Sequence, residues 1–263
     1  MGNKHDYLQR REIIMYEPDS FLEEHLKQII DHFRLKNRGD FKILDWGCGR
    51  GRGVLYFLEK GYDAYGVDID MNTIKKGSPL LREMGYDPNK RLLMPSGLKK
   101  FKDGFFHFIF SEQVFEHVEN LGDVVKSQKR LMKTDGLGCH IFPAAKNIRE
   151  CHVNMPLVHW LPKTRLRKLW ISLMLIFSKK PEVAWPETID TTFWQEVIVY
   201  YNYLNNKTYY RSIGELLSLF EEHNLFADYR ISGVDSVRKK ILPDFLVRNG
   251  FPNQQVYLTV YKK

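Results

Sequence analysis

The feature that most constrains the fold of this chain is a run of alternating glycines, residues 47–53, which we name the glycine loop. The apolar segment 41–45 before it predicts a buried strand, and the apolar positions at 54–58 after it predict a helix. Glycines at a strand-to-helix turn leave room for a ligand to approach the backbone, because side chains would otherwise collide with it. The run therefore predicts an α/β fold with a ligand at this turn.

Strands and helices continue to alternate along the chain, which is typical of βαβ units in a mostly parallel sheet. We predict further strands at 63–68, 91–94, 105–110, 137–142, 228–231 and 255–261. We predict helices at 20–34, 71–84, 121–133 and 212–223. Two late strands after a long helix fit a sheet that is closed by an antiparallel hairpin. Ligands of such sheets bind at the carboxyl ends of the strands.

Breaks in this pattern indicate how the chain is divided. The first helix begins at a predicted capping box of Ser20 and Glu23. After Pro143 the alternation stops, and the chain becomes rich in Trp, His and Pro. We predict an N-terminal helical cap (1–40), a ligand-binding core (41–143), a substrate-binding insertion or lid (144–207) and the C-terminal part of the core sheet (208–263).

Composition excludes several classes of protein. Hydrophobic residues make up 43% of the chain and charged residues 27%, so we expect an ordered globular protein. No apolar run approaches the ~20 residues of a membrane span, and the N-terminus lacks the apolar region of a secretory signal. The three cysteines are widely spaced, which argues against structural zinc and suits a cytoplasmic location. The net charge of +8 favours an anionic partner.

The spacing of the glycines indicates which ligand they serve. A dinucleotide-binding loop reads GxGxxG, whereas this loop reads GxGxGxG and has Arg52 at the third-glycine position. Asp45 would repel a pyrophosphate but attract a ligand that carries an ammonium and a sulfonium. Asp68 ends the next predicted strand, where it can accept hydrogen bonds from two ribose hydroxyls.

Stretches around these residues resemble the class I S-adenosylmethionine (SAM)-dependent methyltransferases: ILDWGCGRG (43–51), GVDID (66–70) and FSEQVFEHV (110–118). The resemblance implies a Rossmann-like α/β fold with a seven-stranded, mostly parallel sheet, a C-terminal antiparallel hairpin and a helical insertion after strand five. It also implies SAM as the cofactor and a SAM-binding core at 41–143. The cofactor-binding residues that it implies are Asp45, Gly47, Gly49, Asp68, Ile69, Ser96 and Ser111. Ser96 stands where many relatives carry an Asp near the adenine amine.

The reaction that this family catalyses needs the acceptor and the methyl group held at attack distance, and a neutral hydroxyl acceptor also needs a base. His117, after strand four, is the leading candidate for the base, although this residue could equally only support the site. His152 is the second catalytic candidate. Some related O-methyltransferases bind a divalent metal through Glu-x-x-Glu-His. Because Gln113 replaces the first of those carboxylates, we expect no metal site.

The insertion leaves the sheet beside the expected SAM pocket and should therefore recognise the acceptor. Its stretch CHVNMPLVHWLP (151–162) resembles one in bacterial methyltransferases of surface-glycan and lipopolysaccharide assembly. An aromatic face suits a sugar ring and guanidinium groups suit a phosphate, so the substrate-binding candidates are His159, Trp160, Arg165 and Arg167.

The basic, apolar segment 163–180 has two interpretations. No acidic residue occurs between Cys151 and Pro181, so the segment could rest on an anionic membrane surface, which for a cytoplasmic protein is the inner membrane. Alternatively, it packs on the sheet as a lid helix with its charges in water.

The leading hypothesis is a methyltransferase that acts on an oxygen of a small molecule or glycan precursor, one that carries phosphate, in surface-polysaccharide (capsule or lipopolysaccharide) biosynthesis. An N-methyltransferase or a nucleic-acid methyltransferase is the alternative within enzymes. Against a nucleic-acid acceptor, strand four is followed by Ser-Glu-Gln and not by an Asn/Asp-Pro-Pro-aromatic loop. The alternative outside catalysis is a SAM-binding protein without activity, against which the intact glycine loop and Asp68 argue.

Overall fold

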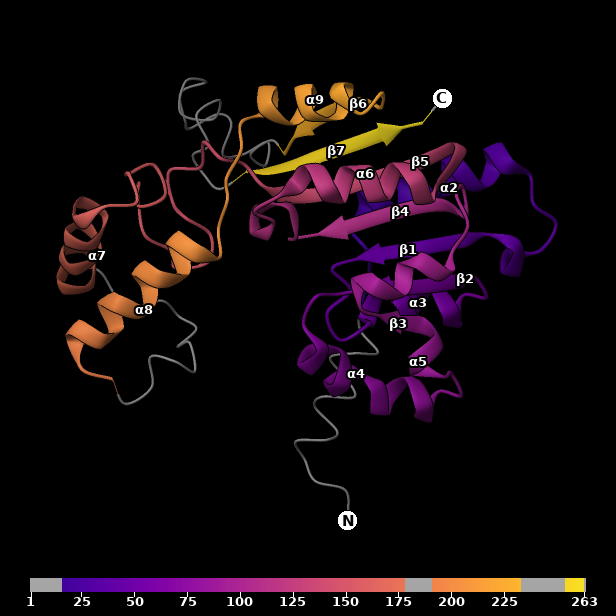
Figure 1. Ribbon diagram of the computed structural model, residues 1–263, viewed down its shortest axis with the longest axis horizontal. Coiled ribbons are helices and arrows are strands. Elements are labelled where there is room, and N and C mark those ends of the chain that lie inside the picture. Colours follow the sequence, from indigo (N-terminus) through magenta and orange to yellow (C-terminus); the bar gives the residue numbers. More distant parts are fainter. Residues whose placement is uncertain (1–15, 178–190, 233–253, 263) are drawn as a thin grey trace, which may run out of the picture.

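The computed structural model describes residues 16–177, 191–232 and 254–262 (Figure 1). At its centre lies a seven-stranded sheet with the order β3-β2-β1-β4-β5-β7-β6. The strands β1 to β5 pair in parallel, whereas β7 pairs antiparallel with both β5 and β6. The predicted fold class, with its C-terminal antiparallel pair, is confirmed. The strands are β1 (Lys42–Trp46), β2 (Asp63–Val67), β3 (Leu92–Leu93), β4 (Phe106–Glu112), β5 (Met132–Pro143), β6 (Phe226–Ile231) and β7 (Gln255–Tyr261).

Helices cover both faces of this sheet and each face has its own buried apolar cluster. On one face, apolar residues of α2, α3 and α4 pack together against β1 and β4. On the other face, α6 and α9 pack against β4, β5 and β7. The α-helices are α2 (Ser20–Phe33), α3 (Arg52–Glu59), α4 (Met71–Glu83), α5 (Pro88–Arg91), α6 (Leu121–Leu131), α7 (Arg165–Phe177), α8 (Phe193–Asn206) and α9 (Ile213–Glu222). The 3-10 helices are η1 (Arg38–Asp40), η2 (Pro95–Lys100) and η3 (Phe115–His117).

The cap of α2 corrects one prediction. The N-cap residue is Asp19, whose carboxylate accepts a 2.8 Å hydrogen bond from the backbone N–H of Phe21. The predicted capping box of Ser20 and Glu23 is therefore wrong, because the chain already contains a better-placed acceptor one residue earlier. A capping box is present at α9, where Ser212 and Glu215 each accept from the other's backbone N–H.

The described residues of the insertion, 144–177 and 191–207, lie beyond the carboxyl ends of β4 and β5 (Figure 1). They contain α7 and α8, which pack against each other and contribute no strand to the sheet. A small apolar core lies beneath them: Val153, Met155, Val158, Ile171, Val197, Tyr200 and Leu204. Within the described ranges, no helix is long and apolar enough to cross a membrane.

Candidate functional site

The glycine loop adopts a backbone that glycine accommodates best at three of its positions. Gly47 has φ +82°, Gly49 has φ +52° and Gly51 has φ +77°. A Cβ on Gly47 would lie 2.3 Å from Val114, so the loop also packs directly on the segment after β4. The N–H groups of Gly47 and Cys48 donate to the carbonyl of Val67, which fixes the loop to the end of β2. The loop is thus held open at the carboxyl edge of the sheet, as the sequence predicts.

Asp68 joins this loop to the start of α4. Its Oδ2 accepts the N–H of Gly49 at 2.8 Å, and its Oδ1 accepts the N–H of Asp70 at 2.8 Å. Each carboxylate oxygen keeps a second lone pair, so both ribose hydroxyls of a cofactor could still donate to it. Beside it, Ile69 is 81% exposed, and no described side chain covers the face expected to contact adenine. Ser96, in η2, is exposed as well.

Acidic groups gather where the methionine portion of SAM is expected. Burial, and secondarily Glu112 and Asp68, raise the pKa of Asp45 well above its usual range. Burial also raises the pKa of Glu112, which accepts a 2.5 Å hydrogen bond from the hydroxyl of Tyr16. A cationic ligand among these carboxylates would offset the cost of burying them. The geometry thus fits a ligand with an ammonium and a sulfonium.

Other residues of this site escaped the sequence reasoning. A Cβ on Gly77, in α4, would lie 1.9 Å from the carbonyl oxygen of Arg50, so α4 touches the backbone of the glycine loop. A Cβ on Gly53 would lie 2.7 Å from the carboxylate of Asp45. Tyr16 is a third such residue, because its hydroxyl donates to Glu112. A glycine in the middle of an apolar helix pattern is the signal that could have identified Gly77.

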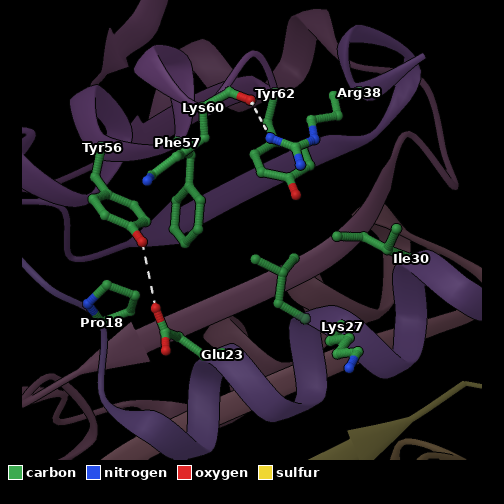
Figure 2. A pocket seen from close by; sticks show the side chains of 10 residues that line it. Pro18, Glu23, Lys27, Ile30, Arg38, Tyr56, Phe57, Lys60 and Tyr62 are labelled. Atoms are coloured by element: carbon green, nitrogen blue, oxygen red, sulfur yellow. Dashed lines mark hydrogen bonds between the residues drawn. The ribbon is translucent and has the colours of Figure 1, made fainter.

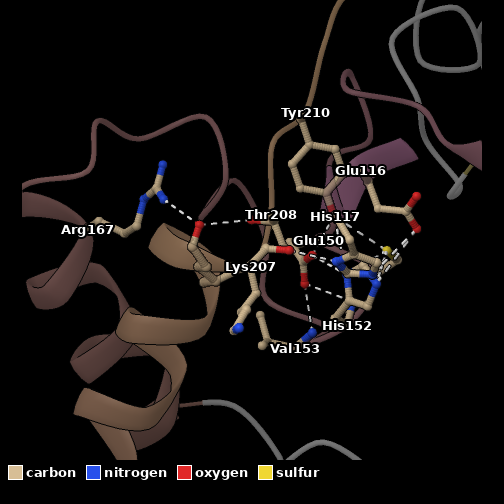
Figure 3. A network of polar contacts seen from close by, with 11 residues as sticks. Glu116, His117, Glu150, His152, Val153, Arg167, Lys207, Thr208 and Tyr210 are labelled. Atoms are coloured by element: carbon tan, nitrogen blue, oxygen red, sulfur yellow. Dashed lines mark hydrogen bonds and ion pairs between the residues drawn. The ribbon is translucent and has the colours of Figure 1, made fainter. Parts of the chain in front are cut away.

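A second group of polar residues lies at the same edge, and we name Glu116, His117 and His152 the polar cluster (Figure 3). Glu116 and His117 belong to η3 after β4, whereas His152 comes from the loop that opens the insertion. Glu116 Oε1 lies 3.8 Å from His117 Nε2 and 4.0 Å from His152 Nε2. The structure therefore brings together the predicted catalytic candidates, which are 35 residues apart in the sequence.

Each histidine of the polar cluster is oriented through its Nδ1. His117 Nδ1 donates to the carbonyl of Lys207 at 2.6 Å, so its Nε2 carries no proton when the ring is neutral. His152 Nδ1 lies 2.7 Å from Glu150 Oε1, and Glu150 also accepts the hydroxyl of Tyr210 at 2.5 Å. Both Nε2 atoms are thereby turned towards Glu116.

The same contacts set the charges of these groups. Burial lowers the pKa of His117. Burial alone would also lower the pKa of His152, but hydrogen bonds to Cys151 and Glu150 outweigh it and raise that pKa to about 10. Burial raises the pKa of Glu116 to about 7. Of the two histidines, His117 is therefore the better placed to accept a proton at neutral pH.

The predicted substrate-binding residues separate into two groups. His159 and Arg167 line one pocket of about 320 Å³, together with Lys163, Thr208 and residues 209–211. Trp160 and Arg165 are exposed and do not line it, and the indole N–H of Trp160 donates to the carbonyl of Ala145.

Two predicted roles need correction. The side chain of Ser111 is buried, and its hydroxyl lies 2.8 Å from His140 Nδ1 within the core, so it does not face a cofactor. Arg167 is buried too, and its guanidinium donates to the carbonyls of Leu161 and Leu204. Arg167 contributes charge to the pocket, but its N–H groups hold the insertion together.

A larger pocket of about 400 Å³ lies between α2 and α3 (Figure 2). It is lined by Glu23, Tyr56 and three cations, Lys27, Arg38 and Lys60. It contains neither the glycine loop nor any residue of the polar cluster. This pocket is therefore not part of the candidate active site.

Comparisons with known proteins agree with this geometry. Residues 44–139 match the family model described as a methyltransferase domain. An uncharacterised protein of Methanocaldococcus jannaschii is 30% identical over 124 residues, 47% of this chain and 49% of that protein. A sterol 4-C-methyltransferase of Caenorhabditis elegans is 28% identical over 118 residues, 44% of this chain and 35% of that protein. This chain thus spans half or less of the length of these curated relatives.

Among solved structures, the fold is similar to that of a SAM-dependent methyltransferase from Mesorhizobium loti. The TM-score is 0.53 at 11% identity, and the match covers 92% of this chain and 98% of the other. The chain therefore has a Rossmann-like fold similar to that of methyltransferases, and its residues 44–139 match a methyltransferase domain. The predicted cofactor, SAM, is confirmed.

Proposed function

We propose that this protein transfers the methyl group of SAM to an oxygen atom of a phosphate-bearing small molecule or glycan precursor, in bacterial surface-polysaccharide biosynthesis. The observation that carries the proposal is the contact between Val114 and Gly47. Because Glu116 and His117 follow Val114 within three residues, this contact places the polar cluster beside the glycine loop. The reacting oxygen would lie against that cluster. The stretch at 151–162 supports a glycan precursor through its resemblance to surface-glycan methyltransferases.

The pocket of about 320 Å³ in the insertion, which we name the cationic pocket, supports a phosphate on the acceptor. It contains Lys163, Arg167 and Arg211, and within the described part of the chain no carboxylate forms an ion pair with any of them. The pocket adjoins the polar cluster through Tyr210, which lines it and donates to Glu150. Arg167 and Arg211 donate their N–H groups to backbone carbonyls and so contribute charge to the pocket rather than direct contacts. A phosphate bound by Lys163 in this positive field would leave the sugar ring near the polar cluster.

A pair of lysine variants tests this assignment. We expect Lys163→Ala to raise the KM of a sugar phosphate by roughly 10-fold, on the order of 1.4 kcal/mol, because a direct cationic contact is lost. The KM of the dephosphorylated sugar and the Kd of SAM should change little. The matched control is Lys168→Ala, whose side chain packs over the ring of Tyr201 and does not line the pocket. Equal effects of both variants, or equal effects on both sugars, would contradict a phosphate subsite.

Turnover with a panel of sugar phosphates and nucleotide sugars separates the remaining alternatives. The atom that carries the new methyl group, identified by mass spectrometry and NMR, distinguishes an oxygen acceptor from nitrogen or carbon. Activity on RNA or DNA would favour the nucleic-acid alternative. SAM binding without turnover of any acceptor in the panel would favour the alternative that the protein binds SAM but has no catalytic activity.

We also propose that α7 rests on an anionic membrane surface, where a lipid-linked acceptor would be presented. One side of α7 packs on the insertion core through Ile171, while the opposite side exposes a stripe of apolar residues. That stripe consists of Leu166, Leu169, Leu173 and Ile176. Arg165 is exposed at the start of the helix, and the helix contains no acidic residue. The C-terminal end of the predicted segment, residues 178–180, lies outside the described residues.

Vesicle sedimentation measures this contact. We expect the protein to sediment with phosphatidylglycerol vesicles and not with neutral phosphatidylcholine vesicles, since binding combines apolar burial with charge attraction. In the double variant Leu169→Ser/Ile176→Ser, the fraction of protein bound to vesicles should fall by at least about half, because less apolar area is available for burial in the membrane. Met84→Ser, which removes another exposed apolar side chain, is the control. Unchanged sedimentation of the double variant would exclude α7 as the contact.

A further inference from the structure

The carboxylate of Glu116 is buried without a hydrogen-bond partner. Its side chain is 2% exposed, and neither Oε1 nor Oε2 has a donor within hydrogen-bonding distance. Burying a carboxyl group without a partner is costly, so such a group in a folded protein calls for an explanation. The nearest candidates are the Nε2 atoms of His117 and His152, at 3.8 and 4.0 Å. These distances are too long for hydrogen bonds.

The arrangement matches that of metal-binding side chains. In metal sites, a ligating histidine donates its other ring N–H to a carboxylate or a backbone carbonyl. Here His152 has Glu150 as that partner and His117 has the carbonyl of Lys207. One possible ligand atom from each of Glu116, His117 and His152 lies within 4.8 Å of the other two. Ligands of a tetrahedral ion with bonds near 2.1 Å are about 3.4 Å apart, so small side-chain rotations would close the site.

We propose that Glu116, His117 and His152 bind one divalent transition-metal cation of the Zn²⁺ type. Two imidazoles and one carboxylate are a ligand set of catalytic zinc sites, whereas Mg²⁺ and Ca²⁺ prefer oxygen ligands throughout. The side chains of His117 and His152 are 33% and 19% exposed, so a fourth position remains accessible to an acceptor.

A neighbouring combination of side chains does not offer such a site. Glu150, Cys151 and His152 also lie close together. However, Glu150 already accepts hydrogen bonds from Tyr210, from His152 Nδ1 and from the backbone N–H groups of His152 and Val153. Its role is to orient His152. The expectation of no metal considered only Gln113 as the third ligand, and the fold supplies His152 in its place.

The role of the cation in the reaction rests on the proposed function, whereas its binding does not. A hydroxyl bound to the fourth position would release its proton to water more readily, because the cation stabilises the alkoxide. The oxygen then attacks the methyl carbon, and the new C–O bond forms as the C–S bond breaks. The electron pair of that bond stays on sulfur, which leaves neutral S-adenosylhomocysteine.

Metal titration of the full, untagged chain tests the site without relying on activity. After dialysis against a chelator, we expect the protein to bind one equivalent of Zn²⁺ by calorimetry, and Co²⁺ to give visible absorption bands of a low-coordinate site. His152→Ala and Glu116→Gln should each weaken Zn²⁺ binding on the order of 100-fold. The loss of a residue that only orients a ligand weakens metal binding by about 10- to 100-fold, and the loss of a ligand itself should cost at least as much. His223→Ala, at the end of α9, is the matched control and should bind like the unmodified chain.

Each outcome decides between the proposals. Binding of less than a tenth of an equivalent, or equal affinity in His152→Ala and His223→Ala, would overturn the metal site. Circular dichroism checks that Glu116→Gln and His152→Ala are folded, and if Glu116→Gln fails to fold, the comparison of His152→Ala with His223→Ala decides. Turnover that survives in a metal-free protein overturns the catalytic role of the cation but leaves the methyltransferase proposal intact. Metal binding that His152→Ala weakens, in a protein that turns over no acceptor, supports the metal site and counts against the proposed function.

Discussion

Asp68→Ala should weaken the binding of SAM and of S-adenosylhomocysteine by about 1.5–3 kcal/mol, which is roughly a 10- to 150-fold rise in Kd. The substitution removes the carboxylate that we propose as the acceptor of two ribose hydroxyls. It also removes the 2.8 Å hydrogen bond that Asp68 accepts from the N–H of Gly49, so the glycine loop loses a contact as well. Isothermal titration calorimetry with both ligands measures the change.

A control separates cofactor binding from general loss of negative charge. Asp103→Ala removes an exposed carboxylate that pairs with Arg130, far along the chain from the glycine loop. We expect its Kd for SAM to equal that of the unmodified protein. Unchanged affinity in Asp68→Ala would mean that this carboxylate does not hold the ribose, and the cofactor assignment at this position would fail.

Gly77→Ala should lower the free energy of unfolding by about 3 kcal/mol, at the upper end of what overpacking a core costs. Helix propensity alone predicts the opposite sign, because alanine is favoured over glycine by about 1 kcal/mol inside a helix. A Cβ at residue 77 would lie 1.9 Å from the carbonyl oxygen of Arg50, so α4 and the glycine loop would have to separate. The affinity for SAM should therefore fall together with stability.

The matched control is Gly214→Ala in α9, where a Cβ meets no atom within 4 Å. Urea unfolding should find this variant as stable as the unmodified protein or more stable by up to about 1 kcal/mol. Equal stability of the Gly77→Ala and Gly214→Ala variants would show that α4 does not rest on the loop backbone as described.

Local patterns predicted most of the core sheet, because its strands are short apolar runs bounded by glycines and carboxylates. Boundaries were less predictable where pairing is irregular. The strand predicted at 137–142 begins at Met132 in the structure, and α6 ends at Leu131 rather than at 133. A shift in register between Phe106 and Phe108 of β4 lets β5 pair before its left-handed residue Asp135. Such pairing depends on a partner strand that lies far away in the sequence.

In the candidate site, too, features set by neighbouring residues were predictable and features set by distant residues were not. The glycine loop and Asp68 were predictable because their geometry is set by neighbouring residues. The approach of His152 to Glu116 was not, since it depends on how the insertion folds back on Tyr210 and Lys207. The predicted contact of Arg167 with the acceptor was wrong for a similar reason. A basic residue in a mostly apolar segment suggested a ligand contact, but carbonyl groups of Leu161 and Leu204 take its N–H groups.

The origin of the polar cluster in both the core and the insertion has a consequence for engineering. Glu116 and His117 follow β4 and are fixed by the same frame that shapes the glycine loop, while His152 and Lys163 belong to the insertion. Under the proposed function, grafting residues 144–207 from a relative would exchange the acceptor-binding half of the site in one step and keep the cofactor-binding half. A successful graft must then bring a histidine with its own carboxylate partner, as His152 has Glu150. Under the proposed function, such a graft would change acceptor preference and leave the affinity for SAM unchanged.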